Sequence, residues 1–147
     1  MSRHEVRDFV DMLHLQAVTK RFAATLGFLP RECSELAIVA SELCSNILKY
    51  GPPGSLELFE SAEAQGKALT LVAHDSGPPF RNLELATQDG WDDSGPIDPI
   101  SIFRRKGMGG GLGAIARLTD RVSVEPEPGG KRIIVVRYLK RPRPGKP

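Results

Sequence analysis

The sequence lacks long apolar runs and has only two cysteines. No apolar stretch in the 147 residues approaches the roughly 20 residues that a membrane-spanning helix needs. The first residues also lack the apolar centre of a secretion signal, so we expect a cytoplasmic protein. Cys33 and Cys44 fall in one expected helix, which separates them by roughly 16 Å along its axis and excludes a disulfide between them.

An excess of charge of one sign is also missing. The chain has 20 basic and 18 acidic residues, a formal net charge of +2. Four of the basic residues lie in residues 140–147, so the rest of the chain is slightly acidic. We therefore expect one domain over residues 1–139, a basic and disordered tail over residues 140–147, and no nucleic-acid or membrane partner.

A P-loop is absent as well, but another glycine-rich stretch stands before a helix-like run at 112–119. It reads Lys-Gly-Met-Gly-Gly-Gly-Leu-Gly over residues 106–113. A backbone without Cβ atoms can approach a bulky anion closely. A helix N-terminus adds unpaired N–H groups and a partial positive charge. The stretch therefore predicts a phosphate cradle, whereas a flexible connector is the simpler alternative.

A dinucleotide fingerprint is a weaker interpretation of the same stretch. Gly109, Gly111 and Ala114 have its loose spacing, but no buried strand precedes them. The acidic residues that would bind a ribose, Glu125 and Glu127, lie among prolines. An oxidoreductase that binds NAD(H) without Mg²⁺ is thus disfavoured by the order of the expected strands.

The remaining pattern predicts an α/β fold, a two-layer sandwich of helices on one face of a mixed sheet. Residues 76–111 are rich in loop-forming residues and long for a plain connector, so we expect them to be functional. Apolar periodicity and turn residues place helices at 11–26, 30–50 and 112–119, strands at 55–59, 68–73, 121–125 and 132–138, and a first strand or helix start within 4–10.

Two short motifs accompany the glycine-rich stretch. Glu42 and Asn46 are four residues apart on the second expected helix and project side by side, with Lys49 on the same side. An amide oxygen can coordinate Mg²⁺, and a carboxylate can polarise a nucleophile, although exposed helices often carry such residues by chance. Asp75 follows an expected strand and precedes Gly77. Its carboxylate can accept a hydrogen bond from a donor such as an adenine amino group, or it can simply initiate a turn.

In this order and spacing, the three motifs resemble the boxes of the GHKL (histidine kinase-like) ATPase superfamily. Within that superfamily, the short chain is similar to the bacterial anti-sigma or switch serine-protein kinases, and among these to the RsbT type. The resemblance covers about residues 5–140. It implies the Bergerat-type ATP-binding fold.

The resemblance also implies roles for individual residues. Asp75 would take the adenine amino group, with Gly77 allowing close approach. Glu42 would be the catalytic base, and Asn46 would hold Mg²⁺. The remaining candidate residues would contact the ATP phosphates: Lys49, Lys106, Gly107, Gly109, Gly110, Gly111, Leu112 and Gly113. Arg105 would be a further source of positive charge.

The implied function is an ATP-dependent serine/threonine kinase of a bacterial partner-switching pathway in sigma-factor or stress-response control. Its substrate would be a STAS-domain antagonist protein, and a sigma factor or a phosphatase would be a further partner. We expect a monomer or a weak homodimer. The alternative is a catalytically weak or inactive nucleotide-binding switch. It is suggested by Pro79, which replaces the second glycine of the Asp-x-Gly-x-Gly box, and by the long segment 81–106, which could form a lid.

Overall fold

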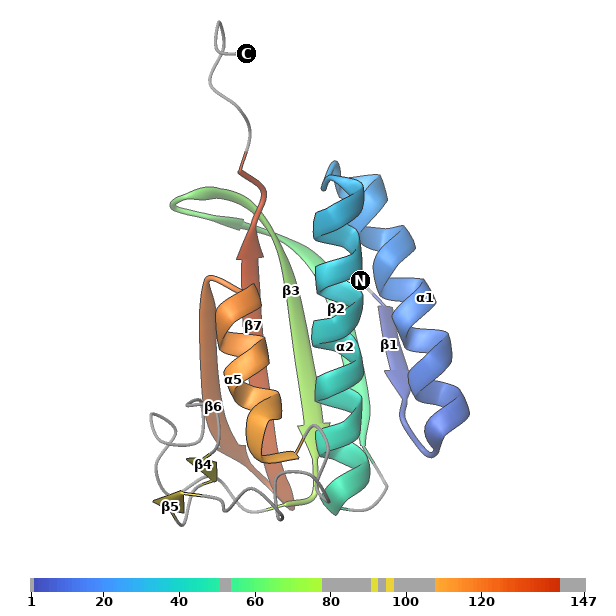
Figure 1. The fold of residues 1–147 in the computed structure, drawn as a ribbon, viewed down its shortest axis with the longest axis vertical. Coiled ribbons are helices and arrows are strands. Elements are labelled where there is room, and N and C mark those ends of the chain that lie inside the picture. Colours follow the sequence, from blue (N-terminus) through green and yellow to red (C-terminus); the bar gives the residue numbers. More distant parts are fainter. Residues whose placement is uncertain (1, 51–53, 78–90, 93–94, 97–107, 141–147) are drawn as a thin grey trace, which may run out of the picture.

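The described residues form three helices layered on one face of a five-stranded sheet in this computed structural model (Figure 1). The structure describes residues 2–50, 54–77, 91–92, 95–96 and 108–140. The helices are α1 (Phe9–Leu26), α2 (Pro30–Tyr50) and α5 (Met108–Leu118). The strands are β1 (Ser2–Glu5), β2 (Ser55–Glu63), β3 (Gly66–Asp75), β6 (Arg121–Glu127) and β7 (Gly130–Tyr138), with a separate pair β4 (Trp91–Asp92) and β5 (Gly95–Pro96).

The main sheet has the strand order β1-β2-β3-β7-β6, and each of these neighbours pairs antiparallel. The predicted α/β two-layer class is therefore confirmed, but the sheet is antiparallel where we expected a mixed one. The reason lies in the connections. If one helix connected β1 to the next strand, the two strands would run parallel. Two helices, α1 and α2, connect β1 to β2, and the second helix reverses the chain direction again, so β2 runs antiparallel to β1. Tight turns join β2 to β3 and β6 to β7.

Local signals fix the ends of the first two helices. Asp8 precedes α1, and its side chain accepts a hydrogen bond from the backbone N–H of Asp11. Gly27 ends α1 with a φ of 105°, a left-handed conformation that favours glycine. Pro30 opens α2, where its fixed φ suits a first helical position. Of the helices that the structure describes, none combines the length and apolarity that a bilayer crossing requires.

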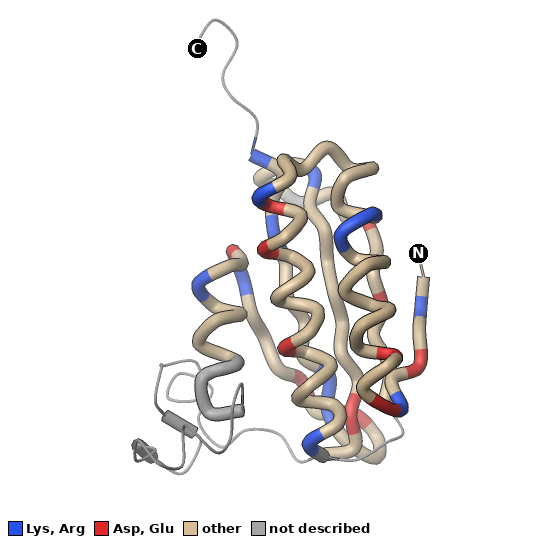
Figure 2. The backbone as a smooth tube through the Cα atoms, turned by 45° about the vertical axis from the view of Figure 1, so that its right-hand side comes forward, with Lys and Arg blue, Asp and Glu red and all other residues tan. Residues whose placement is uncertain are grey.

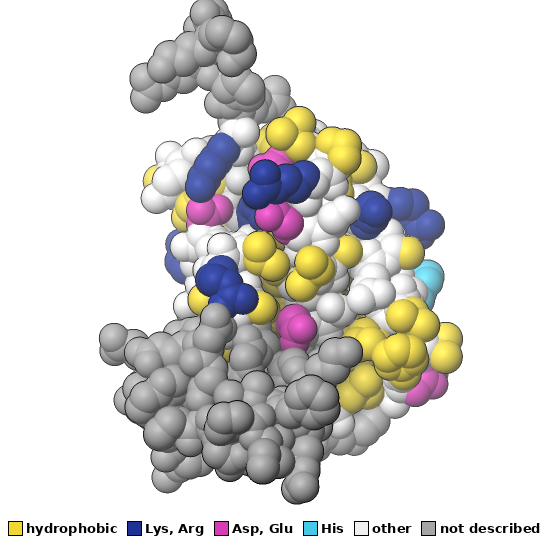
Figure 3. Space-filling model, viewed as in Figure 1, with side chains coloured by type: hydrophobic (Ala, Val, Ile, Leu, Met, Phe, Trp, Pro, Cys, Tyr) yellow, Lys and Arg dark blue, Asp and Glu magenta, His cyan; other side chains and the backbone are white. Residues whose placement is uncertain are grey.

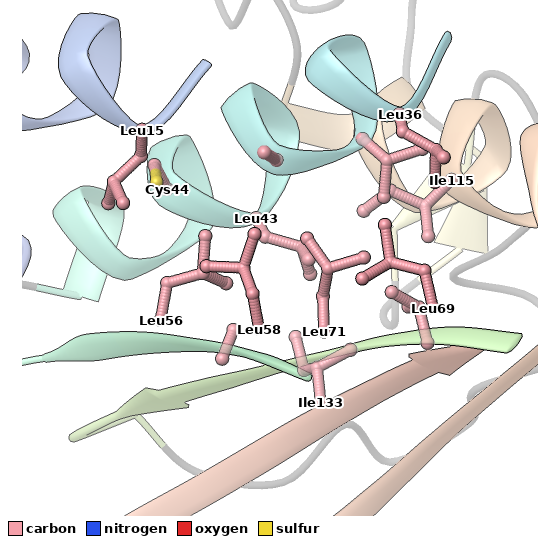
Figure 4. Packing of buried hydrophobic residues seen from close by; sticks show 14 of the residues in the cluster. Leu15, Leu36, Leu43, Cys44, Leu56, Leu58, Leu69, Leu71, Ile115 and Ile133 are labelled. Carbon is pink, nitrogen blue, oxygen red and sulfur yellow. The ribbon is translucent and has the colours of Figure 1, made fainter. Parts of the chain in front are cut away.

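The core lies between the helix layer and the sheet, as Figure 4 shows for its labelled residues. Leu43 of α2 points down toward Leu58 and Leu71 of the sheet, and all three are fully buried. Cys33 and Cys44 are free thiols within this core, as expected. Burial raises the pKa of Cys44 to about 12, so its thiol stays protonated and unreactive. The core fixes α2 over the central strands, and α2 carries two of the candidate residues.

The glycine-rich helix begins earlier than the sequence predicts. We expected a loop followed by a helix from residue 112, but α5 begins at Met108 and includes Gly109 to Gly111 in its first turn. Each glycine in a helix costs about 1 kcal/mol relative to alanine. Packing against α2 offsets this cost, because Leu112 and Ile115 of α5 are buried in the shared core. The predicted loop-to-helix boundary was therefore wrong by four residues.

Candidate functional site

The three sequence motifs meet at one end of the molecule. Figure 1 shows the C-terminal end of α2, the C-terminal end of β3 and the N-terminal end of α5 at its lower edge. Two of these elements, α2 and α5, pack directly against each other, and α2 also packs on β3. Residues that are far apart in the sequence are thus gathered on the helix-covered side of the sheet.

Asp75 is the last residue of β3, and its carboxyl group is fully buried. One oxygen, Oδ1, accepts two hydrogen bonds: 2.8 Å from the backbone N–H of Gly77 and 3.0 Å from the Lys131 ammonium group. The other oxygen, Oδ2, is buried and has no hydrogen-bond partner in the part of the chain that the structure describes. Asp75 therefore initiates a turn with one oxygen and keeps the other as an open acceptor.

Lys131 is a site residue that sequence reasoning missed. It is the residue of β7 directly opposite Asp75, and its side chain is fully buried. A buried ammonium group needs a charged partner, and Asp75 provides one. The sequence contained one indication of this burial. Side chains alternate between the two faces of a strand, so Lys131 lies on the same face as the buried Ile133 and Val135. A lysine in register with core residues indicates a buried ion pair.

Glu42 is half-buried in α2, and its oxygen Oε2 is buried with no hydrogen-bond partner among the described residues. Burial raises the pKa of this carboxyl above its ordinary value of 4.5, because removal from water penalises the charged form. An uncompensated carboxylate with a raised pKa is a stronger proton acceptor than a solvated one. This is the property that a general base requires.

Asn46 and Lys49 continue the same side of α2 toward its end. Asn46 is half-buried one turn after Glu42, and Lys49 is exposed. Within the described residues, no group of three His, Cys, Asp or Glu side chains is arranged to hold a metal ion.

The glycine positions divide between two settings. Gly109, Gly110 and Gly111 lie in the first turn of α5, where backbone N–H groups have no partner inside the helix. Leu112 and Gly113 lie further along, and the side chain of Leu112 is buried in the core. N–H groups at such interior positions pair within the helix. Arg105, Lys106 and Gly107 lie outside the described residues, as do Pro79 and most of segment 81–106.

Arg137 of β7 connects the two helices of the site at the end away from the motifs. Its guanidinium group donates to Glu32 and Glu35 of α2, at 3.4 and 3.1 Å. It also donates at 3.0 Å to the carbonyl oxygen of Leu118, the last residue of α5. The three side chains are mostly buried, so this connection helps fix the distance between α2 and α5.

A cavity of about 550 Å³ reaches Asp75 from the side of the sheet opposite the helices. Its described lining comes from β1, β2, β3, the end of β6 and the connecting residues beside these strands, not from α2 or α5. His74 lies in this lining, with one ring nitrogen 2.8 Å from Glu57 and the other 2.8 Å from Glu127. No described residue of α2 or α5 lines this cavity, so the cavity is separate from Glu42 and from the first turn of α5.

Comparisons with known proteins agree with this geometry. Residues 10–137 match the family model of the histidine kinase-like ATPase domain. The chain is also 27% identical over 131 residues to the serine/threonine-protein kinase RsbT of Bacillus subtilis (strain 168). That alignment covers 88% of this chain and 90% of the relative, so the similarity extends over nearly the full length of both chains.

Proposed function

This chain belongs to the histidine kinase-like ATPase domain family, and on that premise we propose that it is an ATP-dependent serine/threonine protein kinase of a bacterial partner-switching pathway. Its substrate would be a serine or threonine of a STAS-domain protein. The similarity to a protein named as a serine/threonine kinase supports the proposed activity. The observation that carries the proposal is a pair of buried carboxylate oxygens, one on Asp75 and one on Glu42, that have no hydrogen-bond partner among the described residues.

Asp75 would recognise the nucleotide base. Lys131 and the N–H of Gly77 both bond Oδ1, which leaves Oδ2 with no partner among the described residues. Such a buried acceptor suits an amino group, because a base that lacks a donor there would leave Oδ2 unsatisfied. Gly77 has no side chain to block the approach. Adenine carries an exocyclic amino group and fits this chemistry.

Glu42 would accept the proton of the substrate hydroxyl. The hydroxyl oxygen would attack the γ-phosphorus of ATP as the bond from that phosphorus to the bridging oxygen breaks and ADP leaves, and the hydroxyl proton would move to the carboxylate of Glu42. The raised pKa of Glu42 makes it a better acceptor at the moment when the hydroxyl becomes acidic. Burial excludes water from the same oxygen, so the carboxylate is kept for the incoming substrate.

The remaining residues would hold the phosphates. Asn46 can offer its amide oxygen to Mg²⁺, and the first-turn N–H groups of Gly109 to Gly111 can bond phosphate oxygens. Lys49, exposed at the end of α2, would add positive charge. Bound Mg-ATP would supply the phosphoryl group and charge neutralisation by the metal.

Radiolabel transfer from ATP to STAS-domain proteins tests the proposal directly. Glu42→Gln should lower the transfer rate by about 10²–10⁴-fold while ATP affinity stays within about threefold, since a base acts on the chemical step. Glu60→Gln, which neutralises an exposed carboxylate of β2, is the control and should transfer at the wild-type rate. Unchanged transfer in Glu42→Gln would remove the base role. Tight ATP binding without transfer to any serine or threonine would indicate the alternative, a nucleotide-binding switch.

A further inference from the structure

Lys131 and Asp75 form an ion pair in the interior of the protein. Both side chains are fully buried, whereas the charged side chains that Figure 3 shows on the helix face lie at the surface. Figure 2 shows acidic and basic positions next to each other at the lower end of the molecule, where β3 ends and β7 begins. A buried ion pair is often no more stabilising than apolar residues of the same size. Stability of the fold alone therefore explains this pair poorly.

The hydrogen bonds of the pair are distributed unevenly. The Lys131 ammonium group and the backbone N–H of Gly77 both donate to Oδ1 of Asp75, at 3.0 and 2.8 Å. Oδ2 of the same carboxyl group is buried and accepts no hydrogen bond from the part of the chain that the structure describes. A pair that served only the fold would gain by satisfying both oxygens, because an unsatisfied buried acceptor costs folding free energy. The arrangement thus keeps an acceptor for a ligand on the carboxyl group that the cation contacts.

The ammonium group can donate in more than one direction. It carries three N–H groups, and the bond to Oδ1 of Asp75 uses one of them. Strand pairing fixes the backbone of Lys131 beside that of Asp75, since the two residues are register partners in β7 and β3. The end of β3 therefore presents two complementary groups together, an acceptor on Asp75 and a donor on Lys131.

One edge of adenine matches this pair of groups. The edge carries the amino group, a donor, next to the ring nitrogen N1, an acceptor. It is also the edge of the base that lies farthest from the ribose and the phosphates. Because the side chains of Asp75 and Lys131 are fully buried, this far edge is the part of a nucleotide that reaches them.

We propose that Lys131 determines base specificity: its ammonium group donates a hydrogen bond to N1 of adenine, while Oδ2 of Asp75 accepts one from the amino group. The inference rests on the proposed nucleotide binding and adds a second contact that selects the base. Guanine or hypoxanthine in the same orientation places a carbonyl oxygen opposite Oδ2 and an N1–H group opposite the ammonium group. Acceptor then faces acceptor and donor faces donor, so the pair disfavours these bases at two positions.

Calorimetric titration with ATP analogues tests the proposal on the wild-type protein. 1-Deaza-ATP, in which a C–H group replaces N1, should bind at least about tenfold more weakly than ATP, because the ammonium group then faces no acceptor. 3-Deaza-ATP and 7-deaza-ATP are the matched controls. They lack ring nitrogens outside the proposed contact and should bind within about threefold of ATP.

The outcomes separate this inference from the proposed function. Equal affinity for ATP and 1-deaza-ATP, or a loss with 7-deaza-ATP in its place, would overturn the contact between Lys131 and N1 and leave the nucleotide site standing. Absence of ATP binding would remove the nucleotide site and this inference with it.

Lys131→Met tests whether the effect belongs to this side chain. The variant should be less stable, because Asp75 is left as a buried charge without its partner. A general loss of stability weakens ATP and 1-deaza-ATP alike, so the measure is the ratio of their dissociation constants. That ratio should fall from about tenfold or more in the wild type to about twofold or less in Lys131→Met. Lys67→Met, at an exposed lysine of β3, should keep the wild-type ratio. A wild-type ratio in Lys131→Met would contradict the proposal, and the analogue titrations decide it even if this variant does not fold.

Discussion

At the scale of single residues, Glu42 and Asp75 share an uncommon property. Each has one buried carboxylate oxygen without a hydrogen-bond partner among the described residues. A buried acceptor left unsatisfied costs about 1–3 kcal/mol of folding free energy. Two such acceptors, on elements that meet at one end of the molecule, are more readily explained by ligand and substrate contacts than by the stability of the fold.

Glu42 should lower the stability of the protein at neutral pH. Burial raises its pKa above 4.5, so the folded state binds the proton more tightly than the unfolded state. The free energy of unfolding then falls as pH rises from the unfolded pKa through the folded one, and the loss is complete above both. At about pH 7.5, Glu42→Gln should therefore raise the melting temperature by roughly 1–3 °C. Near pH 4 the difference should shrink toward zero.

Thermal melts at the two pH values check this prediction. Glu60→Gln, at an exposed carboxylate, should melt with the wild type at both pH values apart from the loss of a surface ion pair with Lys67. If Glu42→Gln were less stable than the wild type at neutral pH, the carboxylate would be stabilising the fold. The physical argument for Glu42 as the general base would then fail.

At the scale of elements, the start of β7 positions the end of β3. A Cβ atom added at Gly130 would overlap the carbonyl oxygen of Asp75 and crowd the Cα of Ser76. Gly130→Ala should therefore push the two strands apart, lower stability by about 2–4 kcal/mol and weaken ATP binding by about tenfold or more. Urea unfolding and nucleotide titration measure the two effects.

Gly129→Ala is the matched control for this prediction. Gly129 has a φ of 79°, and a Cβ atom added there would meet no described atom within 4 Å. Alanine at this position therefore costs about 1–2 kcal/mol from backbone strain alone. Both variants should be less stable, but Gly129→Ala should bind ATP like the wild type. Equal loss of affinity in the two variants would show that general destabilisation, and not displacement of Asp75, is responsible.

The elements also show what the sequence could and could not predict. The helix from residue 30 to 50 was predicted with its bounds, because Pro30 opens it and the apolar stripe is regular. The start of α5 was missed, because intrinsic propensity disfavours glycine while the packing of Leu112 and Ile115 decides the outcome. The partner of Asp75 was missed for a similar reason: the pairing of Asp75 with Lys131 depends on strand register, which a single sequence does not show.

At the scale of the whole molecule, the proposed nucleotide and catalytic residues gather at one end. The end of β3, α2 and α5 carry them, and α1 lies against α2 with an exposed apolar face. The prediction of a monomer or weak homodimer had no interface to support it in the sequence. The buried and exposed faces of α1 separate only once the fold shows that Met12 and Leu15 point into the core.

Calorimetric titration of ATP, with and without Mg²⁺, into the wild type and Asp75→Asn tests the central claim most directly. The wild type should bind saturably and more tightly with Mg²⁺. Asp75→Asn should lose affinity by at least about 30-fold, roughly 2 kcal/mol, because a donor replaces the open acceptor. Asp120→Asn makes the same change at the other end of the sheet, where Asp120 bonds the N–H of Tyr138, and should bind normally. Absence of binding at millimolar ATP, or equal affinity in Asp75→Asn, would contradict the nucleotide site.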